Sequence, residues 1–120
     1  MVHHHVQLLT DGGGIYTNGV QGTSLSTGTR IEANVVYDQP NPPGAIYLDD
    51  GSRFVTVTNN LTYASPYAYT FLHTRNEPNA VTNNYGDTAG APQWIRDSAG
   101  PEATHPASRA GVCPEADSVR

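Results

Sequence analysis

Three stretches of the sequence share one short pattern that decides the fold: IEANVVYD at residues 31–38, VTVTNNLTY at residues 55–63 and NAVTNNYGD at residues 79–87. In each, an asparagine precedes an apolar or aromatic run. The aligned asparagines Asn34, Asn60 and Asn84 are separated by 60 − 34 = 26 and 84 − 60 = 24 residues. A period of this length is typical of repeat proteins, in which each repeat stacks on its neighbours. The sequence therefore predicts a solenoid.

A second set of similar segments alternates with the first: GGIYTNG at residues 13–19, GAIYLDDG at residues 44–51 and YTFLHTR at residues 69–75. Two strands are therefore expected to recur in each coil. The step from Ile15 to Ile46 is 46 − 15 = 31 residues, longer than the asparagine steps. The excess matches residues 20–29, whose Gly, Ser and Thr content is typical of a loop.

Side chains within each segment are expected to alternate between the two faces of a strand. In IYLDD, Ile46 and Leu48 share one face, and Tyr47 and Asp49 share the other. Coils stacked in parallel would place Ile15 on Ile46 and bury a continuous apolar column.

The same stacking would place Val57 on Val81. At one bend, asparagine side chains are expected to form a hydrogen-bonded ladder, because an amide both donates and accepts and because asparagine tolerates left-handed backbone geometry. The residues expected in this ladder, besides Asn34, are Asn59, Asn60, Asn83 and Asn84.

The coarse prediction is an all-β protein. Segments rich in Val, Thr, Ile and Tyr are separated by Gly, Pro, Asn and Asp, and no stretch before Ala89 has an apolar period of 3.6 residues. A sandwich of antiparallel hairpins is the alternative architecture. It gives no reason for the words IY and NN to recur at the distance of one coil.

Two regions are expected, residues 1–88 with about three coils and residues 89–120 with a different character. The second region is rich in Ala, Pro, Ser and charged residues and shows no repeat. It is predicted to contain one short helix at residues 93–98, with Trp94 and Ile95 covering the last coil, and then a disordered tail.

Charge and composition exclude some classes of partner. The chain has no lysine, and its formal net charge of −5 argues against nucleic acid or an anionic membrane as a partner. Cys113 is the only cysteine, so no intrachain disulfide is expected. The chain has neither a signal-peptide pattern nor an apolar run approaching the ~20 residues of a membrane span.

Longer motifs carry a resemblance to a known family: LLTDGGGIYTNG at residues 8–19, NVVYD at 34–38, GAIYLDDGSRFVTVTNNLTY at 44–63 and WIRDSAGPEA at 94–103. This pattern resembles the closing coils of right-handed parallel β-helix proteins of the pectate-lyase-like superfamily. More narrowly, it is similar to bacterial β-helix glycoside hydrolases of the α-fucosidase, xylanase and β-xylosidase type. The resemblance covers roughly residues 2–103 and implies a secreted parent protein that acts on carbohydrate.

The resemblance also implies that the chain is a C-terminal fragment, because family members have more coils and a cap over the N-terminal end of the core. An uncovered first coil would expose a strand edge, and exposed edges pair with other chains. Self-association through that end is therefore expected.

An outward-facing groove is the predicted functional site. Placing Tyr47 over Phe71, a step of 71 − 47 = 24 residues, aligns aromatic rings beside polar side chains at a spacing of about 4.8 Å. Rings and carboxylates together suit a pyranose, which stacks on the ring and is cleaved by acid and base. The predicted sugar-binding residues are Tyr16, Asn18, Tyr47, Phe71, His73 and Arg75.

Cleavage of a glycosidic bond requires two carboxyl groups. Asp49 and Asp50 are the best candidates, and the resemblance implies aspartates on successive coils at the IYLDDG match. Adjacent carboxylates raise one another's pKa, which would keep one of them protonated. Glu77 is the candidate for a second carboxyl group one coil further along, and the roles of the three acids are left open.

Structural explanations compete with this hypothesis. An Asp-Asp-Gly sequence also forms turns, and Asp49 or Asp50 could bind backbone amides or Ca²⁺. Asp11 is expected roughly 23 Å from Asp49 along an extended strand, too far for a catalytic pair unless the turn folds back. The three histidines at residues 3–5 alternate between faces, so they cannot all bind one ion, and no metal site is assigned to them.

Three function classes therefore follow from the sequence. A glycoside hydrolase is the first. A non-catalytic glycan-binding or structural β-solenoid is the alternative. A polysaccharide lyase is less favoured, because it needs a Lys, Arg or Tyr base, and the chain has no lysine and an acidic predicted groove. No cofactor is expected except possible Ca²⁺.

Overall fold

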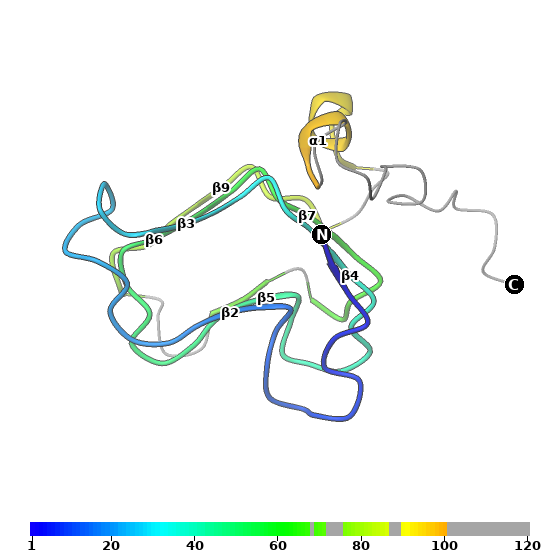
Figure 1. The fold of residues 1–120 in the computed structure, drawn as a ribbon, viewed down its shortest axis with the longest axis horizontal. Helices are drawn as coiled ribbons and strands as arrows, with labels where there is room; N and C mark the ends of the chain where they lie inside the picture. Colours follow the sequence, from blue (N-terminus) through cyan, green and yellow to red (C-terminus); the bar gives the residue numbers. More distant parts are fainter. Residues whose placement is uncertain (68, 72–75, 87–89, 101–120) are drawn as a thin grey trace, which may run out of the picture.

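The computed structural model describes residues 1–67, 69–71, 76–86 and 90–100 (Figure 1). These residues form short strands and one short helix. The elements are β1 (Val2–His3), β2 (Ile15–Thr17), β3 (Thr29–Glu32), β4 (Val35–Tyr37), β5 (Ile46–Leu48), β6 (Val55–Thr58), β7 (Leu61–Tyr63), β8 (Tyr69–Phe71), β9 (Ala80–Thr82) and α1 (Gln93–Ser98).

The strands pair into three parallel sheets, with orders β1-β4-β7, β2-β5-β8 and β3-β6-β9. The chain therefore passes through all three sheets before it adds a second strand to any of them (Figure 1). We call β1–β3, β4–β6 and β7–β9 repeats 1, 2 and 3. Three strands recur in each repeat, not two as predicted, because IEANVVYD bends at Ala33 and Asn34 and contributes to both β3 and β4.

The structure confirms an all-β protein and contradicts the antiparallel sandwich, since every strand pair in the described part of the chain is parallel. Ile15 pairs with Ile46, as predicted. Val57 also pairs with Val81, as predicted.

The predicted pairing of Tyr47 with Phe71 is wrong by one residue. Tyr47 pairs with Thr70, and Phe71 pairs with Leu48. The connection from Leu48 to Val55 covers 55 − 48 = 7 positions, whereas the one from Phe71 to Asn79, the residue level with Val55, covers 79 − 71 = 8. The extra residue lies outside the strands, so a period of 24 residues holds for the sheet of β9 but not for the sheet of β8.

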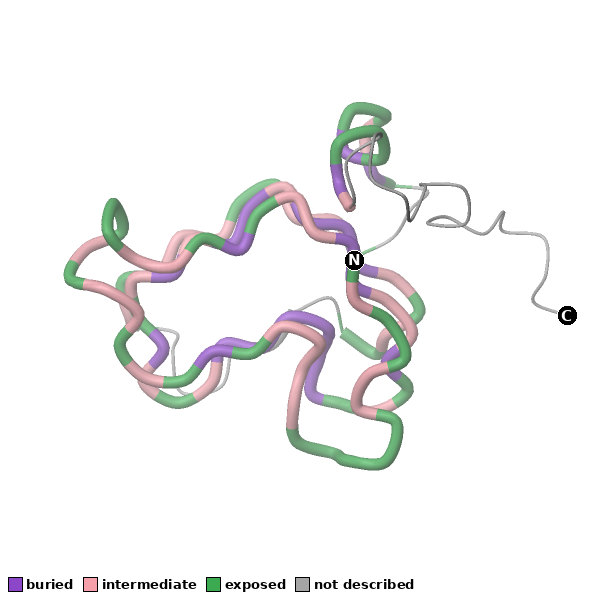
Figure 2. The backbone as a smooth tube through the Cα atoms, viewed as in Figure 1, coloured by how far each residue is buried: buried purple, intermediate pink, exposed green. Residues whose placement is uncertain are grey.

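The main hydrophobic core lies between the three sheets (Figure 2). All three sheets contribute to it, and none of its residues is an aromatic. Parallel strands place equivalent side chains in files, so each repeat covers the apolar surface of the next. The buried residues of this core are Ile31, Val36, Ala45, Ile46, Leu48, Val55 and Val57.

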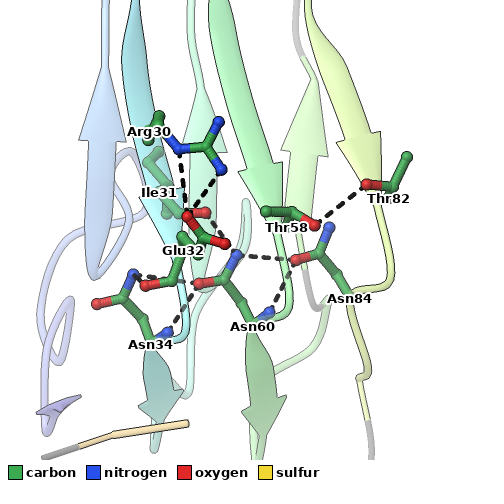
Figure 3. Close-up of polar contacts among 8 residues, drawn as sticks. All are labelled: Arg30, Ile31, Glu32, Asn34, Thr58, Asn60, Thr82 and Asn84. Atoms are coloured by element: carbon green, nitrogen blue, oxygen red, sulfur yellow. Dashed lines mark hydrogen bonds and ion pairs between the residues drawn. The ribbon is translucent and has the colours of Figure 1, made fainter. Parts of the chain in front are cut away.

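A ladder of asparagines connects the repeats at the corner between the β3-β6-β9 and β1-β4-β7 sheets (Figure 3). Asn34 Nδ2 donates to Asn60 Oδ1 at 3.1 Å, and Asn60 Nδ2 donates to Asn84 Oδ1 at 2.8 Å. Each Oδ1 also accepts the backbone N–H of the preceding asparagine, at 2.9 Å for Asn34 and 3.1 Å for Asn60. The predicted ladder is thus confirmed for Asn34, Asn60 and Asn84.

Asn59 and Asn83 do not join these ladder bonds, contrary to prediction. Both have left-handed backbone geometry, with φ of 58° and 53°, and Ala33 occupies the equivalent position with φ of 55°. Asparagine tolerates this conformation better than most residues do. The first residue of each NN pair therefore makes the bend, and the second makes the ladder.

Helix α1 has the predicted bounds and packs against the outside of the β1-β4-β7 sheet (Figure 1). Ile95 is fully buried in a second cluster with Val35 and Leu61. Trp94 is 52% exposed, so only Ile95 of the predicted pair serves as cover. Because Val35 and Leu61 belong to adjacent repeats, the helix covers a side of the stack and not its end. The predicted disordered tail lies largely outside the described residues.

The substitution Asn60→Ala tests the ladder. Asn60 is fully buried and also donates to the Ile31 carbonyl, so its loss leaves several buried polar groups without partners. We expect the free energy of unfolding to fall by about 3 kcal/mol, measured by urea titration. Asn34→Ala, at the end of the ladder, is the matched control and should cost about 1 kcal/mol. Equal losses for the two variants would contradict a central role for Asn60.

The substitution Gly28→Ala tests the close contact between repeats 1 and 2. A Cβ at Gly28 would lie 1.7 Å from the Phe54 carbonyl oxygen, so the two backbones would have to separate. We expect a loss of about 3 kcal/mol in unfolding free energy, or failure to fold. Gly90→Ala, where a Cβ meets no atom within 4 Å, should leave the urea midpoint unchanged. Normal stability of Gly28→Ala would show that this contact is not tight.

Candidate functional site

The strongest candidate site is a carboxylate held by two tyrosines at the end of β5, which we call the Asp49 cluster (Tyr16, Tyr47 and Asp49). The Tyr16 hydroxyl donates to Asp49 Oδ2 at 2.6 Å, and the Tyr47 hydroxyl donates to Asp49 Oδ1 at 2.9 Å. The two rings meet edge to face, with centroids 5.3 Å apart. Pairing of β2 with β5 places Tyr16 beside Tyr47, so the cluster joins repeats 1 and 2.

The backbone around Asp49 forms a turn. The Asp49 N–H donates to the Thr17 carbonyl at 2.9 Å, and the Asp49 carbonyl accepts from the Ser52 N–H at 2.9 Å. Gly51 has a φ of 68°, a conformation that glycine adopts without steric cost. The Asp-Asp-Gly sequence therefore does form a turn, and this turn places the Asp49 carboxylate next to the tyrosines.

The hydrogen bonds hold Asp49 in its ionised form. The Tyr16 hydroxyl is the main cause of a lowered pKa of Asp49, with the Asp50 backbone, Tyr47 and Asn18 acting in the same direction. The prediction that adjacent carboxylates would keep one protonated is therefore wrong for Asp49. Hydrogen bonds that stabilise the charged carboxylate outweigh the cost of its partial burial.

The same contacts act on the tyrosines in the opposite sense. The Asp49 carboxylate raises the pKa of Tyr16, because a phenolate beside it would be repelled. Burial and then Asp49 raise the pKa of Tyr47. Both phenols therefore remain hydrogen-bond donors over the whole neutral range.

Asp11 also belongs to this region, although an extended strand would place it far away. Its charge contributes to the raised pKa of Tyr16 and of Tyr47, and its side chain acts on the Tyr47 hydroxyl directly. The segment before β2 folds back, with positive φ at His4, Val6 and Gly12. The distance estimate from an extended strand fails for this reason.

The predicted row of three outward rings does not form as expected. Tyr16 is 47% exposed, but Tyr47 is 2% exposed and so offers no ring face to a ligand. Phe71 pairs with Leu48 instead of Tyr47. His73 and Arg75 lie outside the described residues. The aromatic surface open to a sugar at this site is therefore Tyr16.

The other predicted acids lie apart from the cluster or at its edge. Asp50 is exposed, and its carbonyl accepts from the Gly19 N–H at 2.9 Å. Glu77 lies in the connection between β8 and β9, where its carbonyl accepts from the Asn79 N–H at 2.7 Å. Within the described residues, no hydrogen bond or ion pair joins Glu77 to Asp49 or Asp50. Asn18 is exposed and contributes to the lowered pKa of Asp49.

An aromatic file does exist, on a different sheet. His3 stacks on Tyr37 with ring centroids 5.1 Å apart, and Tyr37 stacks on Tyr63 at 4.7 Å. Sequence reasoning missed this file, although the signal was present: Tyr37 and Tyr63 each follow a ladder asparagine, Asn34 or Asn60, by three residues. Their rings pack against each other and against the second hydrophobic cluster, so this file stabilises the stack.

Asn79 is a second connecting asparagine that sequence reasoning missed. Its Nδ2 donates to the Ser52 carbonyl at 2.7 Å, and its Oδ1 accepts from the Val55 N–H at 2.9 Å. It therefore fixes the backbone just after the Asp49 turn. Its position directly before β9, level with Val55, was visible in the aligned segments.

Comparison of the chain with protein-family models, with curated proteins and with solved structures gave no significant match. In the described ranges, no group of three or more His, Cys, Asp or Glu side chains is arranged to hold a metal ion. No described helix has the length and apolar character needed to cross a membrane.

The substitution Tyr16→Phe tests the electrostatics of the Asp49 cluster. Loss of the hydroxyl removes the main cause of the lowered pKa of Asp49, so this pKa should rise toward its ordinary value. A lowered carboxyl pKa stabilises the fold above the unfolded-state pKa, and this stabilisation is lost as pH falls through the folded-state pKa. The stability difference between wild type and Tyr16→Phe should therefore shrink in acid.

Carboxyl ¹³C chemical shifts followed against pH measure this pKa directly. Tyr67→Phe, which removes the hydroxyl of another exposed tyrosine, is the control and should leave the Asp49 titration unchanged. An unaltered Asp49 titration in Tyr16→Phe would contradict the hydrogen-bond assignment.

Proposed function

We propose that the three sheets are the faces of a right-handed parallel β-helix. The parallel pairing, the recurring sheet order and the asparagine ladder all support this architecture. Right-handedness follows the general rule for connections between parallel strands. In this proposal, each repeat is one coil, and further coils of the parent protein or another copy of the chain would stack on the open strand edges.

We further propose that the chain is part of a glycoside hydrolase that acts on a polysaccharide or oligosaccharide outside the cell. The observation that carries this proposal is the Asp49 carboxylate, which is half-buried, ionised and oriented by two hydroxyl donors. An ionised, oriented carboxylate is what attacks the anomeric carbon or activates a water molecule in glycoside hydrolysis. The exposed Tyr16 ring offers a surface on which a sugar ring stacks.

The second carboxyl group has to donate a proton to the leaving oxygen. Asp50 and Glu77 remain the candidates from the sequence, and the fold adds Asp11, which acts on the Tyr47 hydroxyl. Asp11 and Asp49 approach the same hydroxyl from different repeats. This placement favours Asp11 over Glu77 as the partner of Asp49.

Glycan binding without cleavage is a second candidate. It is favoured by the fact that both oxygens of Asp49 already accept hydrogen bonds from the protein. A carboxylate with both oxygens engaged makes a good acceptor site but a restrained nucleophile. In this version, Tyr16 and Asp49 bind sugar and hold repeats 1 and 2 together.

The substitution Asp49→Asn separates these possibilities. The amide keeps the shape and an acceptor for Tyr16 but cannot serve as nucleophile or base, so release of reducing ends from xylan or a fucosylated oligosaccharide should fall by about two orders of magnitude or more. Gel retardation on the same glycans measures binding independently. Asp97→Asn, at an exposed position of α1, is the control and should change neither quantity.

Unchanged hydrolysis by Asp49→Asn would remove Asp49 from the chemistry. Retardation of the wild-type chain with no release of reducing ends would support the binding candidate and overturn hydrolysis by this chain.

A further inference from the structure

The three consecutive histidines do not lie as alternating residues of one strand. Strand β1 ends at His3, and His4 has a φ of 55°, so the chain turns into left-handed geometry after the strand. The turn brings two imidazoles together, with His3 Nδ1 2.5 Å from His4 Nδ1. The alternation argument therefore fails for His3 and His4, whose ring nitrogens point toward one another.

An aspartate on the next repeat fixes the orientation of His4. His4 Nε2 lies 2.9 Å from Asp38 Oδ2, with both side chains substantially exposed. A neutral imidazole that donates its Nε2–H to a carboxylate keeps its lone pair on Nδ1. A carboxylate behind a histidine in this manner is the common outer contact of metal-binding histidines, because it fixes the ring and increases its basicity.

The neighbouring ring is fixed by stacking. His3 is the register partner of Tyr37 across the β1 and β4 pair, and the His3 ring lies nearly parallel to the Tyr37 ring at an interplanar angle of 21°. His3 Nδ1 is thereby held facing His4 Nδ1. Two imidazole nitrogens converge on one point because two strands pair and one residue bends.

We propose that His3 and His4 bind one divalent transition-metal ion, with Zn²⁺ as the reference ion, through their Nδ1 atoms. Asp38 is a positioning residue that acts through His4. Water molecules complete the coordination, and His3 needs only to carry its ring hydrogen on Nε2 instead of Nδ1. Imidazole nitrogen suits zinc, copper and nickel, whereas Ca²⁺ and Mg²⁺ prefer oxygen.

The distances allow this arrangement with a small adjustment. A zinc–nitrogen bond of about 2.0–2.1 Å and a tetrahedral angle require the two nitrogens to lie roughly 3.3 Å apart. The present separation of 2.5 Å must therefore increase by roughly 0.8 Å. Rotation of two exposed side chains accommodates such a change.

His5 is excluded from the site. Its ring lies against Gly14, where an added Cβ would sit 2.6 Å from His5 Nε2, and burial lowers the pKa of His5. It therefore belongs to the packing between β1 and β2, not to the pair of converging rings.

A metal at this position would stabilise the edge of the stack. Strand β1 has two residues and is the outer strand of its sheet, so it is held by few contacts. The metal-binding geometry depends on Tyr37 and Asp38 of the next repeat, and so exists only when β1 is paired with β4. Binding should therefore raise the unfolding temperature, since a ligand that binds only the folded state stabilises it.

Isothermal titration calorimetry with ZnCl₂ on the intact chain, near neutral pH in a non-chelating buffer, tests the proposal. We expect one ion per chain. His3→Gln and His4→Gln should each lower the affinity at least tenfold, and Asp38→Asn should lower it by about tenfold. His5→Gln is the matched control and should bind like the wild type, with circular dichroism used to verify its fold. His105→Gln is a second control that removes an imidazole from residues outside the described ranges.

Two further readouts distinguish a built site from a histidine-rich peptide. ¹⁵N spectra of the imidazoles should show Nδ1 as the atom shifted by the ion in both His3 and His4. In concentrated urea, where β1 and β4 separate, the affinity should fall to that of the variants. Absence of binding, equal binding in urea, a loss in His105→Gln or unchanged affinity in Asp38→Asn would each overturn the proposal.

Discussion

The side-chain amide of Asn60 is the contact on which the stacking depends. It accepts the N–H groups of Asn34 and donates to Asn84, so one buried residue connects three consecutive passes of the chain. A buried amide that lacks any of these partners is costly, which makes the alignment of the three asparagines specific. A shift by one residue would break the ladder and would also turn every apolar side chain to the wrong face of its strand.

The ladder works together with a backbone bend. The residue before each ladder asparagine has left-handed geometry, and this bend separates the β3-β6-β9 sheet from the β1-β4-β7 sheet. Because the bend is short, the strands on both sides of it keep the same spacing from repeat to repeat. The connections elsewhere are not constrained in this way, and there the spacing varies.

That variation explains the parts of the candidate site that the sequence did not predict. One extra residue between β8 and β9 moves Phe71 beside Leu48, and so removes it from the row of Tyr16 and Tyr47. The segment before β2 folds back and brings Asp11 near Tyr47. Neither change leaves a mark in the periodicity, because residues in connections have no alternation to read. The pairing of Tyr16 with Tyr47 was predictable, since both residues follow an isoleucine that defines the register.

The sequence alone determined the all-β character, the parallel register of Ile15 with Ile46 and of Val57 with Val81, the asparagine ladder and the bounds of α1. These features depend on local propensity and on a period carried by strands, and both are written in the order of the residues. The tertiary structure decided which side chains meet between strands: Asp49 with two tyrosines, His3 with His4, and Ile95 with the outside of a sheet. Such contacts depend on the path of the connections in space, which the pattern of side chains along a strand does not encode.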